Sequence, residues 1–144
     1  MASVSLRAFA AFLDSKDFKY RVVGDAEDII ATGMSGLKNR KDLGVNIFFG
    51  QNDTDIHIQS KDYLDVPEAK IPAIKEVCHT MNMNFRWAKF TVKEYNDGGF
   101  YVRIESDQII NPETAPAVCW EIMNRLIDIG DDAYPEFMKA MWGA

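Results

Sequence analysis

The sequence has only two cysteines and two histidines, and these low counts exclude several kinds of protein. A disulfide-stabilised scaffold needs more cysteines, and both Cys78 and Cys119 lie within apolar helical patterns. We therefore predict two buried free thiols and a cytoplasmic location, where thiols stay reduced. His57 and His79 do not have the spacing of metal-binding histidines, either to each other or to a cysteine pair, so we predict no bound metal.

Long apolar runs and an excess of basic residues are also missing. No stretch approaches the roughly 20 apolar residues that cross a bilayer. The N-terminal segment lacks a basic lead-in and a convincing cleavage site, which favours an amphipathic helix over a signal peptide. The net charge of −6 argues against nucleic acid or an anionic membrane as a partner. The basic cluster at residues 38–41 is short, and a solvated loop is predicted there.

Motifs that bind phosphate or carry a nucleophile are absent as well. The segment from Gly33 to Gly36 lacks the lysine of a phosphate-binding loop, and there is no G-x-S-x-G elbow. A cysteine–histidine pair would require His57 to fold over Cys78. We predict instead that His57 lies on the exposed face of a strand and His79 on the solvent side of a helix. The sequence therefore predicts no catalytic residue and no cofactor.

Acidic pairs have structural interpretations. Asp53 and Asp55 flank a predicted turn, where aspartate bonds its own backbone, and a calcium loop would need a central glycine between further ligands. The pair at 131–132 follows Gly130 and is predicted to cap a following helix. Another acidic pair, Glu94 and Glu105, lies near facing ends of a predicted hairpin. The basic residues nearby favour cross-strand ion pairs over an acid–base dyad. These basic residues are Lys89, Lys93 and Arg103.

Helical spacing and capping residues predict three long helices. Ser3 is a suitable cap for the first, and Pro67 opens the second, whose regular part is predicted to begin near Pro72. The third is predicted to start with Asn111 and its following proline and to end at Gly130. The apolar positions lie at residues 4–13, 71–81 and 118–129, and a further short helix is predicted at 134–142.

Alternation of apolar and polar residues predicts two antiparallel hairpins. The first joins residues 45–49 to 56–59, and the second joins 88–92 to 100–104 through the turn at 96–99. Shorter β-prone stretches precede them at 20–23 and 29–34. We therefore predict that residues 1–144 form one α+β domain with the order α-β-β-β-(β)-α-β-β-α. Its antiparallel sheet should have helices packed on one face.

Aromatic residues are abundant where a sheet covered on one side should be polar. By alternation, the second face of the sheet carries Phe48, Trp87, Tyr95 and Tyr101. Such a face can be a protein-binding or dimer surface, or it can be partly covered by the N-terminal helix or the C-terminal tail. Met138, Met141 and Trp142 in that tail can likewise dock on the same chain or on a partner.

The order and character of these segments resemble the YbjN-type domain, a family of candidate sensory-transduction regulators with a fold similar to type III secretion chaperones. The resemblance covers nearly the whole chain. Its residues are Phe12-Leu13, Asp17-Phe18-Lys19-Tyr20, Gly44-Val45-Asn46-Ile47-Phe48-Phe49, Pro67, Asn82, Asn84, Lys89-Phe90-Thr91-Val92 and Asp97-Gly98-Gly99. The resemblance implies an α–β–β–β–α–β–β–α layout, often a homodimer, and no catalytic residues to carry over.

Relatives among the type III secretion chaperones bind extended effector chains, and the resemblance implies the same kind of partner as an expectation for this sequence. The present sequence differs from those chaperones by a tail around Tyr134-Pro135, which could cover a chaperone-type partner surface. The favoured hypothesis is a non-enzymatic, chaperone-like or regulatory adaptor that binds another protein. The alternative is a small-molecule site or enzyme between sheet and helices, using His57, Arg103 or Cys78; a structural subunit also stays open.

Overall fold

Seven strands form one antiparallel sheet in the computed structural model, which describes residues 2–143. The predicted α+β class and order of elements are confirmed, and one short additional strand, β5, appears before the second helix. The elements are α1 (Val4–Ser15), β1 (Arg21–Val23), β2 (Ile29–Ser35), β3 (Asp42–Phe49), β4 (Asp55–Lys61), β5 (Leu64–Val66), η1 (Glu68–Lys70), α2 (Ile71–Asn84), β6 (Lys89–Glu94), β7 (Phe100–Ile109) and α3 (Ala115–Trp142).

The long strand β7 holds the sheet together. Strands β1 to β4 follow one another as antiparallel neighbours, and β4 then pairs with β7 from Asp55↔Ile109 to Gln59↔Glu105. The other half of β7 pairs with β5, while β6 pairs with β7 through the predicted hairpin. Because a strand has two edges, β4 and β5 share one edge of β7 and β6 occupies the other.

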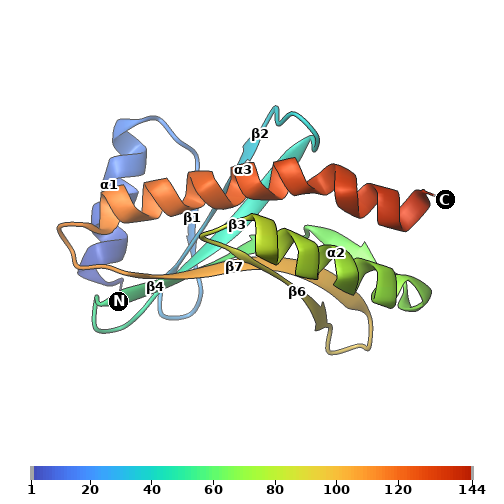
Figure 1. The fold of residues 1–144 in the computed structure, drawn as a ribbon. Coiled ribbons are helices and arrows are strands. Elements are labelled where there is room, and N and C mark those ends of the chain that lie inside the picture. Colours follow the sequence, from blue (N-terminus) through green and yellow to red (C-terminus); the bar gives the residue numbers. More distant parts are fainter. Residues whose placement is uncertain (1, 144) are drawn as a thin grey trace.

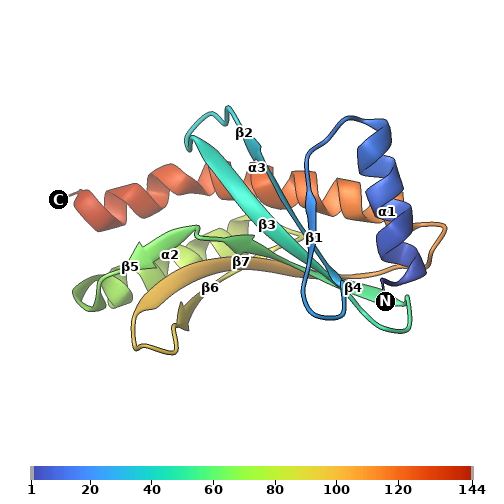
Figure 2. The same ribbon diagram turned by 180° about the vertical axis from the view of Figure 1, so that it is seen from behind.

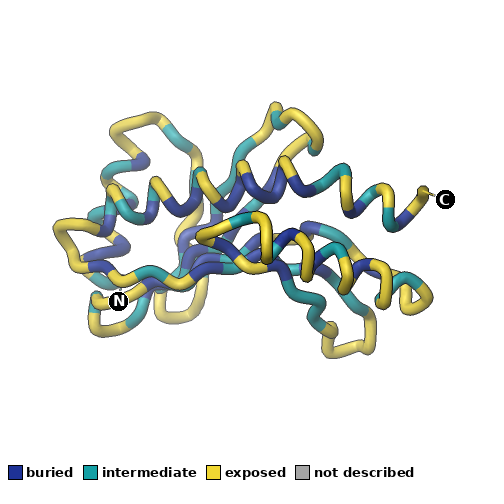
Figure 3. The backbone as a smooth tube through the Cα atoms, in the orientation of Figure 1, coloured by how far each residue is buried: buried dark blue, intermediate teal, exposed yellow. Residues whose placement is uncertain are grey.

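Helices α2 and α3 cover one face of this sheet, and within residues 2–143 no helix crosses the other face (Figures 1 and 2). Residues that alternate along the strands fill the space below the helices, and the predicted core residues Val45, Ile47 and Phe49 are buried. Figure 3 shows buried stretches along α3 and along the strands of the sheet, and their side chains belong to one hydrophobic core layer. Burying each such aliphatic side chain contributes about 1.5–3 kcal/mol, so this layer determines which face the helices cover.

Helix α1 begins where two side chains satisfy its free N–H groups. Ser3 accepts a hydrogen bond from Leu6 N at 3.1 Å, as predicted, and Asp53 Oδ1 accepts one from Ser5 N at 2.8 Å. The bond from Ser5 holds the pKa of Asp53 below its ordinary value. Asp53 N also donates to Gly50 O across the predicted turn. The turn between β3 and β4 is therefore fastened to the start of α1.

The second helix begins as predicted and the third begins later than predicted. A single 3-10 turn follows Pro67, and regular helix starts at Ile71. At the third helix, Asn111 and Thr114 exchange side-chain and backbone hydrogen bonds in a separate capping turn. The helix proper therefore starts at Ala115.

Helix α3 is continuous from Ala115 to Trp142, so the prediction of a helix end at Gly130 is wrong. Gly130 serves packing instead. A Cβ at this position would lie 2.8 Å from Ile104 Cδ1 and 2.9 Å from Leu43 Cδ2. In addition, the hydroxyl of Tyr63 donates to Gly130 O at 2.6 Å. The glycine thus lets the helix approach the sheet closely.

The interior Pro135 does not break α3, because another segment replaces the backbone bond that proline removes. Its missing N–H would have bonded to Asp131 O, and the side chain of Asn39 donates to that oxygen at 2.9 Å. The carboxylate of Asp131 accepts bonds from Lys38 N at 3.0 Å and from Asn39 N and Arg40 N, both at 2.9 Å. The residue that was predicted to cap a following helix therefore binds the β2–β3 loop.

The predicted loop at 38–41 is present, and Lys38, Asn39 and Lys41 are exposed as expected, but Arg40 is half-buried and completes this attachment. Its guanidinium carbon lies 4.9 Å from the ring centroid of Tyr63 and 5.0 Å from that of Tyr134. The side chain also donates to Tyr63 O at 2.5 Å and to Asp42 O at 3.0 Å. The guanidinium group of Arg40 thus contacts aromatic rings and backbone oxygens of its own chain.

The C-terminal part of α3 packs on the covered face of the sheet. The ring of Phe137 lies 5.7 Å from Tyr63 and 5.5 Å from Phe90, and Met141 is buried. Met138 packs against the core, whereas Trp142 is 76% exposed. The tail therefore docks on its own chain through its methionines, and it leaves the second sheet face uncovered.

No helix within residues 2–143 combines the length and the apolar character needed to span a bilayer.

Candidate binding surface

The uncovered face of the sheet carries the side chains that alternate with the core. Along β7, Val102 and Ile104 point into the core, while Tyr101, Arg103 and Glu105 are half-buried on the open face. The predicted alternation is therefore confirmed. Asn82 fixes the position of β6 in this face, because its amide both donates to and accepts from the backbone of Phe90, at 2.9 and 2.7 Å.

Two of the four predicted surface aromatics meet at the hairpin end of the sheet. The rings of Tyr95 and Tyr101 stack with centroids 4.3 Å apart and planes inclined by 29°. The hydroxyl of Tyr95 donates to Asp65 Oδ1 at 2.7 Å, and this bond, with partial burial, raises the pKa of Tyr95 to about 12. Tyr101 accepts a bond from Arg103 Nη2 at 2.6 Å. The pair is thus held in one orientation.

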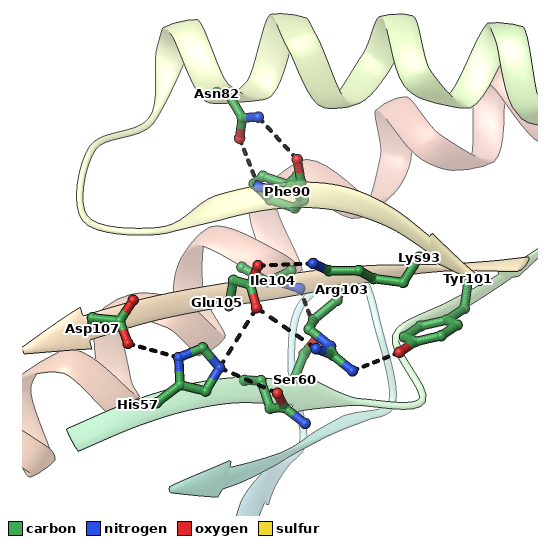
Figure 4. A network of polar contacts seen from close by, with 11 residues as sticks. His57, Ser60, Asn82, Phe90, Lys93, Tyr101, Arg103, Ile104, Glu105 and Asp107 are labelled. Carbon is green, nitrogen blue, oxygen red and sulfur yellow. Dashed lines mark hydrogen bonds and ion pairs between the residues drawn. The ribbon is translucent and has the colours of Figure 1, made fainter. Parts of the chain in front are cut away.

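Charged side chains form a ladder across the middle of the open face (Figure 4). Glu105 lies 3.5 Å from Lys93 Nζ, 3.8 Å from Arg103 Nη1 and 3.5 Å from His57 Nε2. The other ring nitrogen of His57 lies 2.8 Å from Asp107 Oδ1. The predicted cross-strand pairing of Glu105 is confirmed, and His57 is half-buried within the ladder. We call these five residues the polar ladder.

The polar ladder separates Phe48 from the tyrosine pair. Phe48 faces His57 in the strand register, with ring centroids 6.0 Å apart, and His57 in turn faces Asp107. Tyr101 lies at the opposite end of β7. The predicted surface is therefore not one continuous aromatic patch.

Trp87 lies in the loop before β6, next to α3. Its backbone has φ of 77°, and the residue is 52% exposed. The guanidinium carbons of Arg86 and Arg125 lie 5.4 and 5.3 Å from its ring centroid. A groove of about 480 Å³ runs beside the ring along Val118 and Ile122 of α3. We call Trp87 and the two arginines the Trp87 corner.

A left-handed backbone at a tryptophan is a strained arrangement, and a bulky residue in this region costs of order 1–3 kcal/mol. Its neighbours are held by contacts of their own. Ala88 is buried, and Arg125 is paired with Glu121 at 2.7 Å. The ring of Trp87 is thus half-exposed and lies beside two arginine side chains.

Other residues considered from the sequence do not come together. Cys78 and Cys119 are buried free thiols, as predicted, and burial raises their pKa values to about 11 and about 12. Cys78 lies on the buried side of α2, on the covered face of the sheet, whereas His57 lies on the open face. His79 is exposed on α2, as predicted. Within residues 2–143, no three histidine, cysteine or acidic side chains gather in a way that could hold a metal ion.

The sequence did not reveal Ile109, which is 88% exposed at the end of β7. The alternation that places Tyr101 and Glu105 on the open face continues to this residue, and that signal could have identified it. Its exposed side chain lies beyond Asp107 on the same face of the strand. Ile109 therefore adds an apolar residue to the end of the open face that carries Phe48.

Comparison with known proteins identifies the fold. The sequence matches no family model and no curated protein. Among solved structures, it resembles the crystal structure of YbjN from E. coli, described there as a candidate transcription regulator, with a TM-score of 0.64. The match covers 92% of this chain and 93% of YbjN, at 10% sequence identity. The chain has the YbjN fold. At 10% sequence identity, the similarity supports the same arrangement of helices and strands, and it assigns no role to any residue.

Proposed function

We propose that the chain is a non-enzymatic adaptor that binds another protein, with the Trp87 corner as its main contact. The observation that carries this proposal is the half-exposed side chain of Trp87, whose ring lies against two arginines. Tryptophan and arginine are the residue types that most often dominate binding energy at protein interfaces.

The surroundings of Trp87 fit an interface more closely than a reaction site. The adjoining groove is lined by Val118 and Ile122 and has room for an apolar side chain of a partner. Tyr95 and Tyr101 offer a second contact on the open face, and Phe48 a third. The partner surface is thus proposed to span several separate aromatic contacts around the polar ladder.

The kind of partner follows from charge and fold. A chain of net charge −6 repels nucleic acid and anionic membranes, so we propose a protein as partner. The two buried free thiols suit a reducing compartment, and we therefore propose the cytoplasm as location. A regulatory role is in keeping with the description of YbjN, whose fold the chain shares. We also propose that the protein acts as a homodimer. Kinship with the type III secretion chaperones stays a prediction.

Affinity capture tests the proposal in the native cell. The tagged full chain, after chemical crosslinking, should retain at least one protein that the Trp87→Ala/Tyr101→Ala double variant loses at least tenfold. Trp142→Ala is the matched control, because it removes an equally large exposed ring far along α3. Equal recovery by the wild type and the double variant would remove the basis for the Trp87 corner.

Light scattering tests the homodimer separately. The wild type should have twice the 16.3 kDa mass of one chain. A mass of a single chain at micromolar concentration would refute the dimer while leaving the adaptor proposal to the capture experiment.

The alternative, a small-molecule or catalytic site between sheet and helices, is not favoured by the geometry. His57 and Arg103 belong to the polar ladder on the open face, whereas Cys78 is buried on the other side. The cationic groups nearest to Glu105 are already paired with it. The residues suggested for such a site therefore do not converge.

A further inference from the structure

A hollow of about 920 Å³ lies where α1 leads into β1, beside strands β2 and β3, and the proposed function does not use it. A second hollow of about 440 Å³ shares Gly33, Gly44 and Lys61 with it. By their lining residues, the two hollows together follow β2 and β3 away from β1. Figure 2 shows the course of these strands.

The floor of this groove is a pair of glycines that face each other in the strand register. Gly33 is required by packing, because a Cβ there would lie 2.6 Å from Leu43 O. Gly44 is not: a Cβ there would have its nearest neighbours at 3.6 Å, an ordinary contact distance. Glycine inside a strand often marks a place where a ligand approaches the backbone. The open space above Gly44 is therefore not a consequence of close strand packing.

Among residues 2–143, three cations without partners line the larger hollow, whereas the smaller hollow is also lined by Asp42 and Asp62. Lys19, Arg21 and Lys61 border the larger hollow, and none of them makes a salt bridge or a side-chain hydrogen bond within residues 2–143. The only carboxylate in that lining, Asp14, accepts the hydroxyl of Tyr20 at 2.9 Å. Three uncommitted positive charges thus gather at one hollow of a protein whose net charge is −6.

We propose that the larger hollow of this groove binds a small organic anion that carries a carboxylate or phosphate group. Arginine matches both groups with two parallel hydrogen bonds, and the lysines add point charges. The larger hollow has the size of a small-molecule site, and the rings of Phe18 and Tyr20 supply an apolar wall. The ligand would lie on rigid strands, away from Trp87, so the site is independent of the adaptor proposal.

Amide NMR of the full ¹⁵N-labelled chain tests the site. Citrate, inorganic phosphate, AMP and uncharged adenosine are titrated separately at constant ionic strength. At least one anion should shift the amide signals of Gly33 and Gly44 saturably, and adenosine should not. The citrate and phosphate arms distinguish a carboxylate ligand from a phosphate ligand, and AMP against phosphate measures the contribution of the aromatic wall.

Variants separate a specific site from general attraction. Arg21→Gln/Lys61→Gln should weaken binding at least tenfold, whereas Arg7→Gln/Lys75→Gln, which removes two exposed charges elsewhere, should change it less than twofold. Gly44→Val should fill the groove and abolish binding; if it misfolds, the charge variants decide. The proposal is overturned if no anion gives saturable shifts, if the shifts lie elsewhere, or if both charge variants weaken binding equally.

Discussion

Replacing Asp131 should release the β2–β3 loop from α3 and destabilise the protein strongly. The carboxylate is 6% exposed and accepts hydrogen bonds from the backbone N–H groups of Lys38, Asn39 and Arg40. At the lower end for bonds to a charged group, about 1.5 kcal/mol each, the three bonds give about 4.5 kcal/mol. Because water can reach the exposed loop after truncation, we expect Asp131→Ala to cost about 3 kcal/mol.

The asparagine variant provides a graded comparison. Oδ1 accepts from Asn39 and Arg40, so Asp131→Asn can keep these two bonds, whereas its NH₂ group would face the N–H of Lys38. Two donors then oppose each other, and we expect a loss of about 1.5 kcal/mol. The order of stability should be wild type, then asparagine, then alanine.

Urea unfolding followed by far-ultraviolet circular dichroism measures these differences. For a slope of about 2 kcal/mol per molar, the alanine variant should unfold at a urea concentration roughly 1.5 M lower. Asp132→Ala is the control, since Asp132 is the exposed neighbour and should change stability by less than about 0.5 kcal/mol. A loss below about 0.5 kcal/mol for Asp131→Ala, or equal losses at both positions, would refute the role assigned to this carboxylate.

Three further results are expected. Gly130→Ala should destabilise by about 1–2 kcal/mol in urea, despite the better helix propensity of alanine, because its methyl would crowd Ile104 and Leu43; a gain in stability would contradict the packing. Native protein should react slowly with Ellman's reagent at pH 8 and show two thiols per chain in urea, and fast native reaction would contradict the burial of Cys78 and Cys119. Because burial raises both thiol pKa values, the folded state keeps protons that the unfolded chain loses above about pH 8.5. The free energy of unfolding should therefore fall with rising pH, by at most about 1.4 kcal/mol per pH unit for each thiol, and a Cys78→Ala/Cys119→Ala variant with an unchanged slope would refute this assignment.

Local patterns were sufficient for the hairpins and for most of the helices. The alternation in β3, β4, β6 and β7 reflects which side chains the helices cover, and that signal is contained in each strand. Strand β5 has only three residues, too few for alternation to be recognised. The continuity of α3 depends on Tyr63 and Asn39, which lie 67 and 92 positions away from the backbone oxygens that they bind. No local pattern could reveal these contacts.

The candidate surface was predictable only in part. Hairpin register was enough to place Tyr95 near Tyr101 on one face. The separation of Phe48 from that pair depends on the order of the strands, which inserts β4 and the polar ladder between them. The position of Trp87 next to α3 depends on a left-handed backbone that ends the alternation before β6 begins. Strand order and single-residue conformation both arise from tertiary contacts.

Site-specific photocrosslinking in the native cell tests the adaptor proposal most directly. Trp87 is replaced by benzoylphenylalanine, a similarly large aromatic residue, and Trp142 is replaced in a control; both positions are exposed. Irradiation should join a protein covalently at position 87, either a partner or a second copy of the chain, and should give at least tenfold less of that product at position 142. No protein adduct at position 87, or equal yields at the two positions, would contradict the proposal.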